Sequence, residues 1–271
     1  MKDVKGKVAV VTGAGSGIGR ALAQELAAKG AQVWGTDVNA QGLGETVDLV
    51  RAGGYEIVTS LSDVSQKDDV AALAEKVRGE MGQVDILINN AGVAMTGTFS
   101  TLSLEDMEWI FSINYWGVVY CTQAFLPLLM ARPESSLVNV SSLFGLLGVA
   151  RNSAYCSTKF AVRALSETLR QELKGSSVSV TSVHPGGIKT NIVRNARVID
   201  AEGQVCEEKH DKFSALFDRI ARTTPEKAAS LIVSAIEKKK PRLLIGSDAK
   251  TGDLIQRFFP GSFDRILSRL L

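Results

Sequence analysis

A tyrosine and a lysine stand four positions apart in a segment, residues 153–174, whose pattern predicts a helix. At that spacing the side chains of Tyr155 and Lys159 project from one helix face. An ammonium beside a phenol favours the phenolate and lowers the tyrosine pKa from its usual value of about 10. Tyr155 could then accept or donate a proton at an alcohol or carbonyl oxygen. The pair therefore predicts acid–base chemistry.

Two serines precede this pair and follow a predicted strand at 136–140. A hydroxyl at the carboxyl end of a strand can bind the oxygen that reacts, and the spacing to Tyr155 favours Ser142 for this role. Ser141 is expected to cap or pack. Hydride transfer would belong to a bound cofactor, because the protein supplies position and electrostatics.

Two other reactive side chains near these positions are predicted to be structural. Cys156 adjoins Tyr155, but successive helix residues point about 100° apart, so packing is the expected role of the thiol. His184 precedes Pro185 at the end of a predicted strand. An imidazole there is expected to form structural hydrogen bonds rather than to act as a base.

A glycine-rich turn at residues 12–19 follows the first predicted strand and opens a helix. Its pattern, T-G-x-x-x-G-x-G, differs in spacing from the GxGxxG of many dinucleotide folds. Glycines let backbone N–H groups approach a pyrophosphate, and the helix N-terminus adds its positive dipole. In the context of strand, turn and helix, the motif predicts a dinucleotide site.

An aspartate closes the second predicted strand at Asp37. A carboxylate there can accept hydrogen bonds from both hydroxyls of an adenosine ribose, and it repels a 2′-phosphate. Neither Ser16 nor Val38 supplies a cation that would offset this repulsion, so NAD is favoured over NADP. Two alternatives stay open: Arg20 could hold a 2′-phosphate, and Asp37 could cap the next helix.

Strands and helices alternate along the whole chain, which predicts parallel βαβ units with right-handed crossovers. No linker divides the sequence, so residues 1–271 are expected to form one domain of the Rossmann type, with a doubly wound parallel sheet of seven strands. The predicted strands span 7–12, 32–37, 55–61, 84–89, 136–140, 178–183 and 242–246, and the predicted helices after the first lie near 40–52, 66–80, 104–131, 153–174 and 225–239.

The composition excludes several classes of protein. Hydrophobic residues make up 45% of the 271 residues and the net charge is only +2, which is typical of a folded globular domain and argues against nucleic acid as a partner. Three cysteines without a CxxC pair indicate neither a disulfide framework nor a metal site, and they favour a reducing, cytoplasmic location. The uncharged stretch at 109–131 is interpreted as a buried helix rather than a membrane span.

Taken together, the motifs resemble those of the short-chain dehydrogenases/reductases, in their short single-domain branch, over nearly the whole chain. The matching pieces, in order, are residues 12–19, Asp63-Val64, residues 89–92, Asn114, Ser142, Tyr155 with Lys159, Pro185-Gly186 and Thr190. The resemblance implies a catalytic tetrad of Asn114, Ser142, Tyr155 and Lys159, in which Asn114 holds a water that links Lys159 to solvent. It also implies the strand order 3-2-1-4-5-6-7.

The resemblance further assigns the cofactor contacts. Asp63 and Val64 would meet the adenine, residues 90–92 the adenosine ribose, and Ile188 and Thr190 the nicotinamide. The full set of expected cofactor-binding residues is Gly13, Ser16, Gly17, Ile18, Gly19, Asp37, Asp63, Val64, Asn90, Ala91, Gly92, Tyr155, Lys159, Pro185, Gly186, Ile188 and Thr190. The family also implies a homodimer or homotetramer that packs the two long helices carrying Asn114 and Tyr155.

Apolar residues after the strands predict a lipophilic secondary alcohol or ketone as the substrate. The long connection 187–224 contains Phe213, Leu216, Phe217 and Ile220 at helical spacing, which predicts an amphipathic lid over the site or a helix packed on the protein body. Lys189 and Arg194 could instead read a substrate anion, or face solvent or a cofactor phosphate.

The apolar tail at 249–271 also carries arginines. Packing on the sheet edge or on another subunit is favoured over contact with a membrane surface. Two other functions are weighed against a dehydrogenase: a nucleotide-sugar epimerase or dehydratase, and a non-catalytic dinucleotide sensor. The glycine spacing and the lack of a separate C-terminal substrate domain speak against the first, and the complete tetrad speaks against the second.

Overall fold

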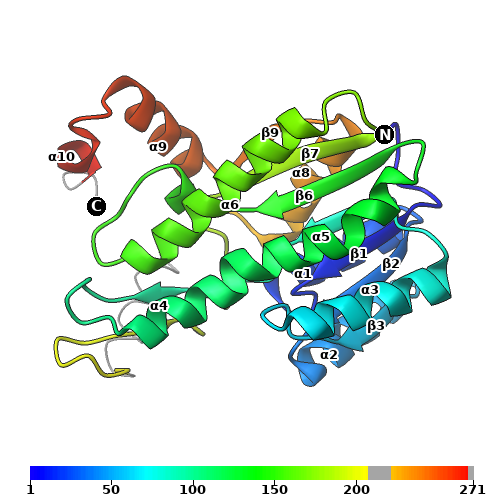
Figure 1. Cartoon of the computed structure of the whole chain (residues 1–271), viewed down its shortest axis with the longest axis horizontal. Coiled ribbons are helices and arrows are strands. Elements are labelled where there is room, and N and C mark those ends of the chain that lie inside the picture. Colours follow the sequence, from blue (N-terminus) through cyan, green and yellow to red (C-terminus); the bar gives the residue numbers. More distant parts are fainter. Residues whose placement is uncertain (207–220, 268–271) are drawn as a thin grey trace.

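The computed structural model describes residues 1–206 and 221–267 (Figure 1). The predicted lid helix with Phe213, Leu216, Phe217 and Ile220 lies outside the described residues. Of the described residues, no helix is both long enough and apolar enough to cross a bilayer.

Seven parallel strands form one sheet in the order β3-β2-β1-β4-β6-β7-β9. Counted within this sheet, the order is 3-2-1-4-5-6-7, so the predicted topology is confirmed. The strands are β1 (Val8–Thr12), β2 (Gln32–Asp37), β3 (Val58–Leu61), β4 (Ile86–Asn89), β6 (Ser135–Val140), β7 (Val178–Pro185) and β9 (Arg242–Ile245). β1, β4 and β6 are buried along their whole length, which explains the apolar runs of β1 and β4, whereas β6 also buries Ser135, Ser136 and Asn139.

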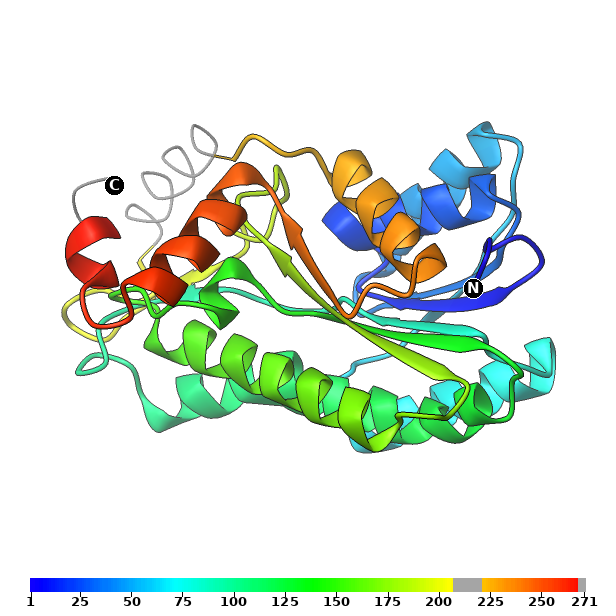
Figure 2. The same cartoon turned by 90° about the horizontal axis from the view of Figure 1, so that it is seen from above.

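Helices cover both faces of the sheet, as Figure 2 shows from above. One face packs against α1 (Gly17–Ala28), α2 (Ala40–Ala52) and α8 (Pro225–Glu237), and the other against α3 (Lys67–Met81), α5 (Gly117–Met130) and α6 (Ser153–Glu172). Each face therefore has its own apolar core, and the predicted three-layer architecture is confirmed.

Two elements differ most from the sequence expectation in their bounds. The predicted strand 55–61 begins only at Val58, because the chain is still in the turn that follows α2, where the Tyr55 amide donates to the Val50 carbonyl. The predicted helix 104–131 consists of α4 (Leu104–Phe111), a π-helical turn η1 (Ser112–Trp116) and α5. A π turn inside a helix is rare and is frequent at functional sites.

A second, two-stranded sheet was not predicted. β5 (Met95–Thr96) pairs in parallel with β8 (Arg197–Val198). Directly after β5, the Gly97 amide donates to the Arg151 carbonyl, which lies shortly before α6. Strands of two residues are too short to produce an alternating pattern in the sequence. This small sheet ties the chain after β4 to the long connection after β7.

The C-terminal segment is helical and lies beyond the carboxyl ends of the strands (Figure 1). α9 (Ser247–Phe258) packs through Gly252 against Leu143 and Leu147, and α10 (Phe263–Leu267) follows it. The large apolar residues Leu254, Phe258 and Phe259 are exposed. Asp253 of α9 pairs with Arg242 of the edge strand β9, so this part of the tail packs on the sheet edge as expected, whereas these three side chains do not.

Candidate active site

The glycine-rich turn forms an open helix N-terminus at the end of β1. Gly13 and Gly17 adopt positive φ angles of 67° and 50°. A Cβ on Gly13 would come within 2.9 Å of the Ala91 Cα, so a side chain would collide with the backbone after β4. Ser16 begins α1 in an extended conformation and makes no side-chain cap within the described chain. The first-turn N–H groups are thus available to an anionic ligand.

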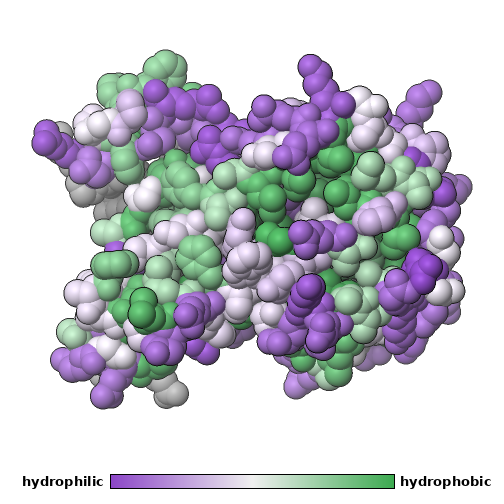
Figure 3. Space-filling view, in the orientation of Figure 1, coloured by the Kyte–Doolittle hydropathy of each residue, from purple (hydrophilic) through white to green (hydrophobic). Residues whose placement is uncertain are grey.

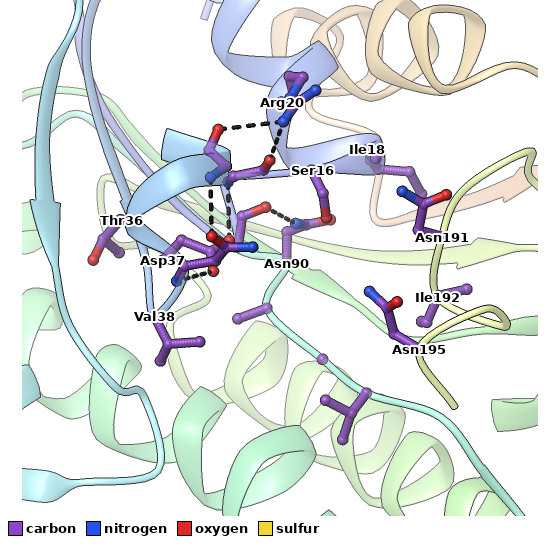
Figure 4. Close-up of a pocket in the computed structure, with 18 of the residues that line it drawn as sticks. Ser16, Ile18, Arg20, Thr36, Asp37, Val38, Asn90, Asn191, Ile192 and Asn195 are labelled. Atoms are coloured by element: carbon purple, nitrogen blue, oxygen red, sulfur yellow. Dashed lines mark hydrogen bonds between the residues drawn. The ribbon is translucent and has the colours of Figure 1, made fainter. Parts of the chain in front are cut away.

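A cavity of about 650 Å³ extends from this turn along the carboxyl ends of β1, β2 and β4. Figure 4 shows Asp37 and Asn90 on one side and Asn191, Ile192 and Asn195 across from them. Most of the expected cofactor-binding residues line it: Gly13, Ser16, Gly17, Ile18, Asp37, Asp63, Val64, Asn90, Ala91, Gly92 and Thr190. The turn, the carboxylate and the elongated shape fit a nicotinamide dinucleotide.

Six expected cofactor-binding residues do not line this cavity: Gly19, Tyr155, Lys159, Pro185, Gly186 and Ile188. A Cβ on Gly19 would lie 1.9 Å from the Gly13 carbonyl oxygen, so Gly19 lets α1 pack against the turn. Pro185 ends β7, and Gly186 lies against the carboxylate of Asp248. Ile188 is 3% exposed and belongs to the apolar core. Gly19, Gly186 and Ile188 thus contact other parts of the protein, and the cofactor contacts expected for these residues and for Pro185 stay predictions.

Other cavity residues gave no signal in the sequence. Asn191, Ile192 and Asn195 follow Thr190 without a recognisable pattern. Ser62 lines the cavity beside Asp63, and its buried hydroxyl has no hydrogen-bond partner within the described chain. A buried hydroxyl without a partner costs free energy, so this atom is an additional polar contact for a ligand.

The carboxylate of Asp37 faces the glycine-rich turn. Its Oδ2 accepts a hydrogen bond from the Gly15 amide at 2.9 Å, and its Oδ1 accepts one from the Asn39 amide at 3.0 Å. Asn39 caps α2 by accepting from the Gly42 amide. The alternative of Asp37 as the helix cap is therefore wrong.

The nearby cation of Arg20 is held by other groups. Its Nη2 donates to the Gly15 carbonyl at 2.5 Å and to Glu45 Oε2 at 2.7 Å, and its Nε donates to the Thr46 hydroxyl. The Arg20 hydrogen bond is the largest factor that lowers the pKa of the Glu45 carboxyl. Arg20 thus fastens α1 to α2, and Glu45 neutralises the charge that a 2′-phosphate would need.

The structure brings Ser142, Tyr155 and Lys159 together at the carboxyl end of β6. The Ser142 hydroxyl acts on the Tyr155 phenol and lowers its pKa. Lys159 Nζ lies 5.7 Å from the centre of the Tyr155 ring and donates to the Val140 carbonyl at 3.2 Å. A Cβ on Gly92 would lie 3.2 Å from the same Nζ, so Lys159 reaches the wall of the cavity.

The amide of Asn114, in the π-helical turn η1, lies on the same side of Gly92 as Lys159. Its Oδ1 accepts from the Val93 amide at 2.8 Å, and its Nδ2 donates to the Val93 carbonyl at 2.9 Å and to the Thr158 hydroxyl at 3.2 Å. Asn114 is fully buried. It therefore joins the chain after β4 to the helix that carries Tyr155 and Lys159.

Ser141 has a separate, structural role. Its hydroxyl donates to the Lys159 carbonyl at 2.8 Å, which anchors α6 to the end of β6. The sequence interpretation of Ser141 as a packing residue is confirmed.

Burial sets the protonation of the acid–base pair. It raises the pKa of Tyr155 to about 12, and the hydrogen bond with Ser142 offsets only part of this rise. It lowers the pKa of Lys159 to about 8. The predicted lowering of the Tyr155 pKa by Lys159 is therefore wrong for the protein without a cofactor, because desolvation is the largest influence on the phenol and Lys159 is not among the groups that shift it. At neutral pH Tyr155 holds its proton and can donate it.

Comparison with known proteins matches this geometry to a family. The sequence model described as short chain dehydrogenase matches residues 7–199. The chain belongs to the short-chain dehydrogenase family. The SadH protein of Mycobacterium tuberculosis, which is named an oxidoreductase, is 43% identical over 99% of this chain and 96% of its own length.

Two further members of the short-chain dehydrogenase family extend the comparison. The ketoacyl reductase HetN of a Nostoc species is 30% identical over 98% of this chain and 90% of its own. A crystal structure of a short-chain dehydrogenase/reductase from Burkholderia phymatum in complex with NAD superposes with a TM-score of 0.87, at 30% identity and 95% coverage of both chains. The fold and the oxidoreductase class are therefore shared over nearly the whole chain.

Replacement of Gly19 by alanine tests the close packing behind the cavity. The added methyl group would overlap the Gly13 carbonyl, so we expect Gly19→Ala to lower the free energy of unfolding by about 1–3 kcal/mol. Gly44→Ala is the matched control, because Gly44 is also helical and has no atom within 4 Å of its Cβ position. It should raise stability by roughly 1 kcal/mol. Similar effects of the two substitutions in urea unfolding would contradict the packing argument.

The lowered pKa of Lys159 predicts a pH-dependent stability. Because folding lowers this pKa from 10.5 to about 8, the unfolded chain binds more protons between these pH values, and stability rises with pH there. Relative to Lys159→Met, the unmodified protein should gain about 3 kcal/mol across this window, measured by urea unfolding. The same substitution at the exposed Lys238 serves as control. A stability gap that does not change with pH would mean that Lys159 is not desolvated.

Proposed function

We propose that this protein is an NAD-dependent oxidoreductase that interconverts a lipophilic secondary alcohol and a ketone, with Tyr155 as general acid and base. The observation that carries the proposal is the grouping of Ser142, Tyr155 and Lys159 at the carboxyl end of β6, where Lys159 Nζ lies 5.7 Å from the centre of the phenol ring and the Ser142 hydroxyl acts on the phenol. A nucleotide site beside these three groups supports hydride chemistry, and the family is one of oxidoreductases.

The proposed mechanism gives each side chain one task. In reduction, the substrate oxygen accepts hydrogen bonds from the hydroxyls of Ser142 and Tyr155, and Tyr155 donates its proton to that oxygen. When bound, the nicotinamide supplies the hydride to the substrate carbon, or accepts it in oxidation. Lys159 stabilises the phenolate that remains and returns a proton to it. A water on Asn114, as the family resemblance implies, would connect Lys159 to solvent.

An apolar surrounding of Tyr155 supports a lipophilic substrate. The ring of Phe144 packs edge-on against the ring of Tyr155, with 6.0 Å between the two ring centres. Leu143 and Leu147 lie on either side of Phe144 in the same loop. α9 covers this loop through Gly252, which brings the C-terminal segment to the substrate side. The similarity to a ketoacyl reductase supports a carbonyl group on an aliphatic chain as the substrate class.

Substitution of Tyr155 by phenylalanine tests the function. It removes the proton donor and leaves the ring in place, so we expect kcat to fall by about 10²–10⁴-fold for any substrate found in a panel of lipophilic ketones and alcohols. The affinity for NAD should stay within about threefold, measured by calorimetry. Tyr120→Phe, on α5 beside Trp116, is the matched control. Persistent turnover in Tyr155→Phe would refute the mechanism, and NAD binding without any turnover would favour a sensor.

The carboxylates at the ribose end support NAD as the cofactor. Asp37 and Glu45 both line the cavity, and Arg20, which also lines it, is paired with Glu45. A 2′-phosphate would meet two negative charges and a cation that is already neutralised. The NAD complex of the Burkholderia phymatum protein agrees with this choice.

Asp37→Ala is expected to raise KM for NAD by about 10–100-fold, because charge-assisted hydrogen bonds to the ribose are lost. It should lower KM for NADP, and adding Glu45→Gln should lower it further by releasing Arg20. Asp48→Ala, an exposed position on α2, is the control. Equal loss of both cofactors in the double variant would count against this account of specificity.

A homodimer or homotetramer is the proposed assembly. Along the face in Figure 3, apolar patches follow α5 and α6, where Trp116, Met130 and Phe160 are exposed. An aromatic and apolar face on two long helices is suited to a subunit interface. Trp116→Glu should shift the protein toward monomers in sedimentation velocity, whereas Leu61→Glu, on the edge strand β3, should not. A monomeric unmodified protein would contradict the proposal.

The proposed location is the cytoplasm, supported by three cysteines that are all free thiols. For the exposed residues Leu254, Phe258 and Phe259 we propose contact with another subunit, with a membrane surface as the alternative.

A further inference from the structure

A buried histidine lies directly beneath the candidate proton-transfer site. His184 is the penultimate residue of β7, opposite Leu244 of β9, and it is 0% exposed. The mechanism proposed above gives it no role, yet its ring points at the chain segment that carries Ser142.

Two hydrogen bonds fix the ring of His184. Nδ1 lies 3.2 Å from the Ser142 carbonyl oxygen, and Nε2 lies 3.0 Å from the Ser182 hydroxyl. A carbonyl oxygen only accepts, so Nδ1 carries the proton and donates it to Ser142. Nε2 is then the acceptor, and the Ser182 hydroxyl donates to it. Both nitrogens of a neutral imidazole are satisfied in this arrangement.

The surroundings keep the imidazole neutral. Burial is the main cause that lowers the pKa of His184 to about 4, and the nearby cations of Arg242 and Arg163 act in the same direction, against Glu167 and the hydrogen bond to Ser142. The donor at Nδ1 is therefore present throughout the neutral and alkaline range without adding a charge next to Ser142.

The contact occurs where the ladder between β6 and β7 ends. The last paired residues are Val140 and Val183, and the final ladder bond runs from the Ser141 amide to the Val183 carbonyl at 2.8 Å. Ser142 is the first residue beyond it and begins the 3₁₀ turn η2 (Leu143–Gly145). Backbone pairing with β7 thus stops one residue before the serine whose hydroxyl must be placed.

His184 supplies the next contact between β7 and the chain that follows β6. The Ser142 carbonyl accepts from the Gly145 amide at 3.0 Å within its own turn and from His184 across the sheet. The Ser142 hydroxyl accepts from the Phe144 amide at 3.1 Å. The turn η2 therefore fixes the local conformation of Ser142, and the hydrogen bond from the His184 imidazole holds the Ser142 carbonyl against β7.

We propose that His184 is a positioning residue, whose Nδ1–H holds the Ser142 peptide in register with β7 and so places the serine hydroxyl against Tyr155 and the reacting oxygen. The inference deepens the proposed function and rests on it for its effect on catalysis. A displacement of about 1 Å at such a group can cost about 10²-fold in rate, so a lost tether would be visible in kcat.

Two substitutions separate the two ring nitrogens. In His184→Asn the side-chain amide takes the place of Nδ1 and can still donate to the Ser142 carbonyl. In His184→Gln the amide reaches toward the place of Nε2, so the contact with Ser182 can remain while the donor to Ser142 is lost. Ser182→Ala removes only the partner of Nε2 and is the matched control for that side of the ring.

The expected result is a split between the two variants. His184→Gln should lower kcat by about 30–100-fold, and His184→Asn and Ser182→Ala by no more than about threefold, with the Kd for NAD unchanged in all three. Equal losses in His184→Gln and His184→Asn would mean that the imidazole only fills space. Full activity in His184→Gln would equally overturn the proposal.

Hydrogen–deuterium exchange tests the tether without any substrate. The amides of Phe144 and Gly145 should exchange faster in His184→Gln than in His184→Asn, because their acceptors both belong to Ser142. Identical exchange in the two variants would overturn the inference. If the unmodified protein turns over no alcohol or ketone, the proposed function fails, and this measurement still decides whether His184 holds Ser142.

Discussion

A small set of hydrogen bonds between the ends of β1 and β4 is the constraint on which the site depends. The Thr12 hydroxyl accepts from the amides of Asn90 and Ala91, both at 3.0 Å, and the Asn90 side chain donates to the Thr12 carbonyl at 2.9 Å. Side chains thus continue the parallel pairing past the point where the ladder stops. Without them, the glycine-rich turn and the chain that leads toward Tyr155 would be independent loops.

From this junction a continuous path of contacts reaches the proton-transfer residues. The chain runs from Ala91 to Val93, whose amide and carbonyl are both bound by Asn114. Asn114 also donates to the Thr158 hydroxyl, which in turn donates to the Tyr155 carbonyl at 2.8 Å. One hydrogen-bonded framework therefore positions both the dinucleotide cavity and the phenol. Its side chains come from β1, from the chain after β4, from the turn η1 and from α6.

Much of the fold and of the site could be predicted from the sequence, because both rest on local patterns. Apolar runs gave the seven strands, and Tyr155 and Lys159 at helical spacing gave the chemistry that the structure brings together with Ser142. Effects that depend on contacts between residues far apart in the chain could not be predicted from the sequence. The pairing of Arg20 with Glu45 joins separate elements, the high pKa of Tyr155 comes from burial, and the tether from His184 depends on where a ladder ends.

The long helix that runs through α4, the π-helical turn η1 and α5 carries a polar group on its inward stripe. Ile110, Asn114, Val118 and Phe125 recur at helical spacing and are all buried, so the Asn114 amide lies in line with apolar side chains that pack into the interior. A π turn at this position is typical of a functional site. The opposite side of the same helix, where Trp116 and Met130 are exposed, can therefore change its surface chemistry while the amide stays where the interior needs it.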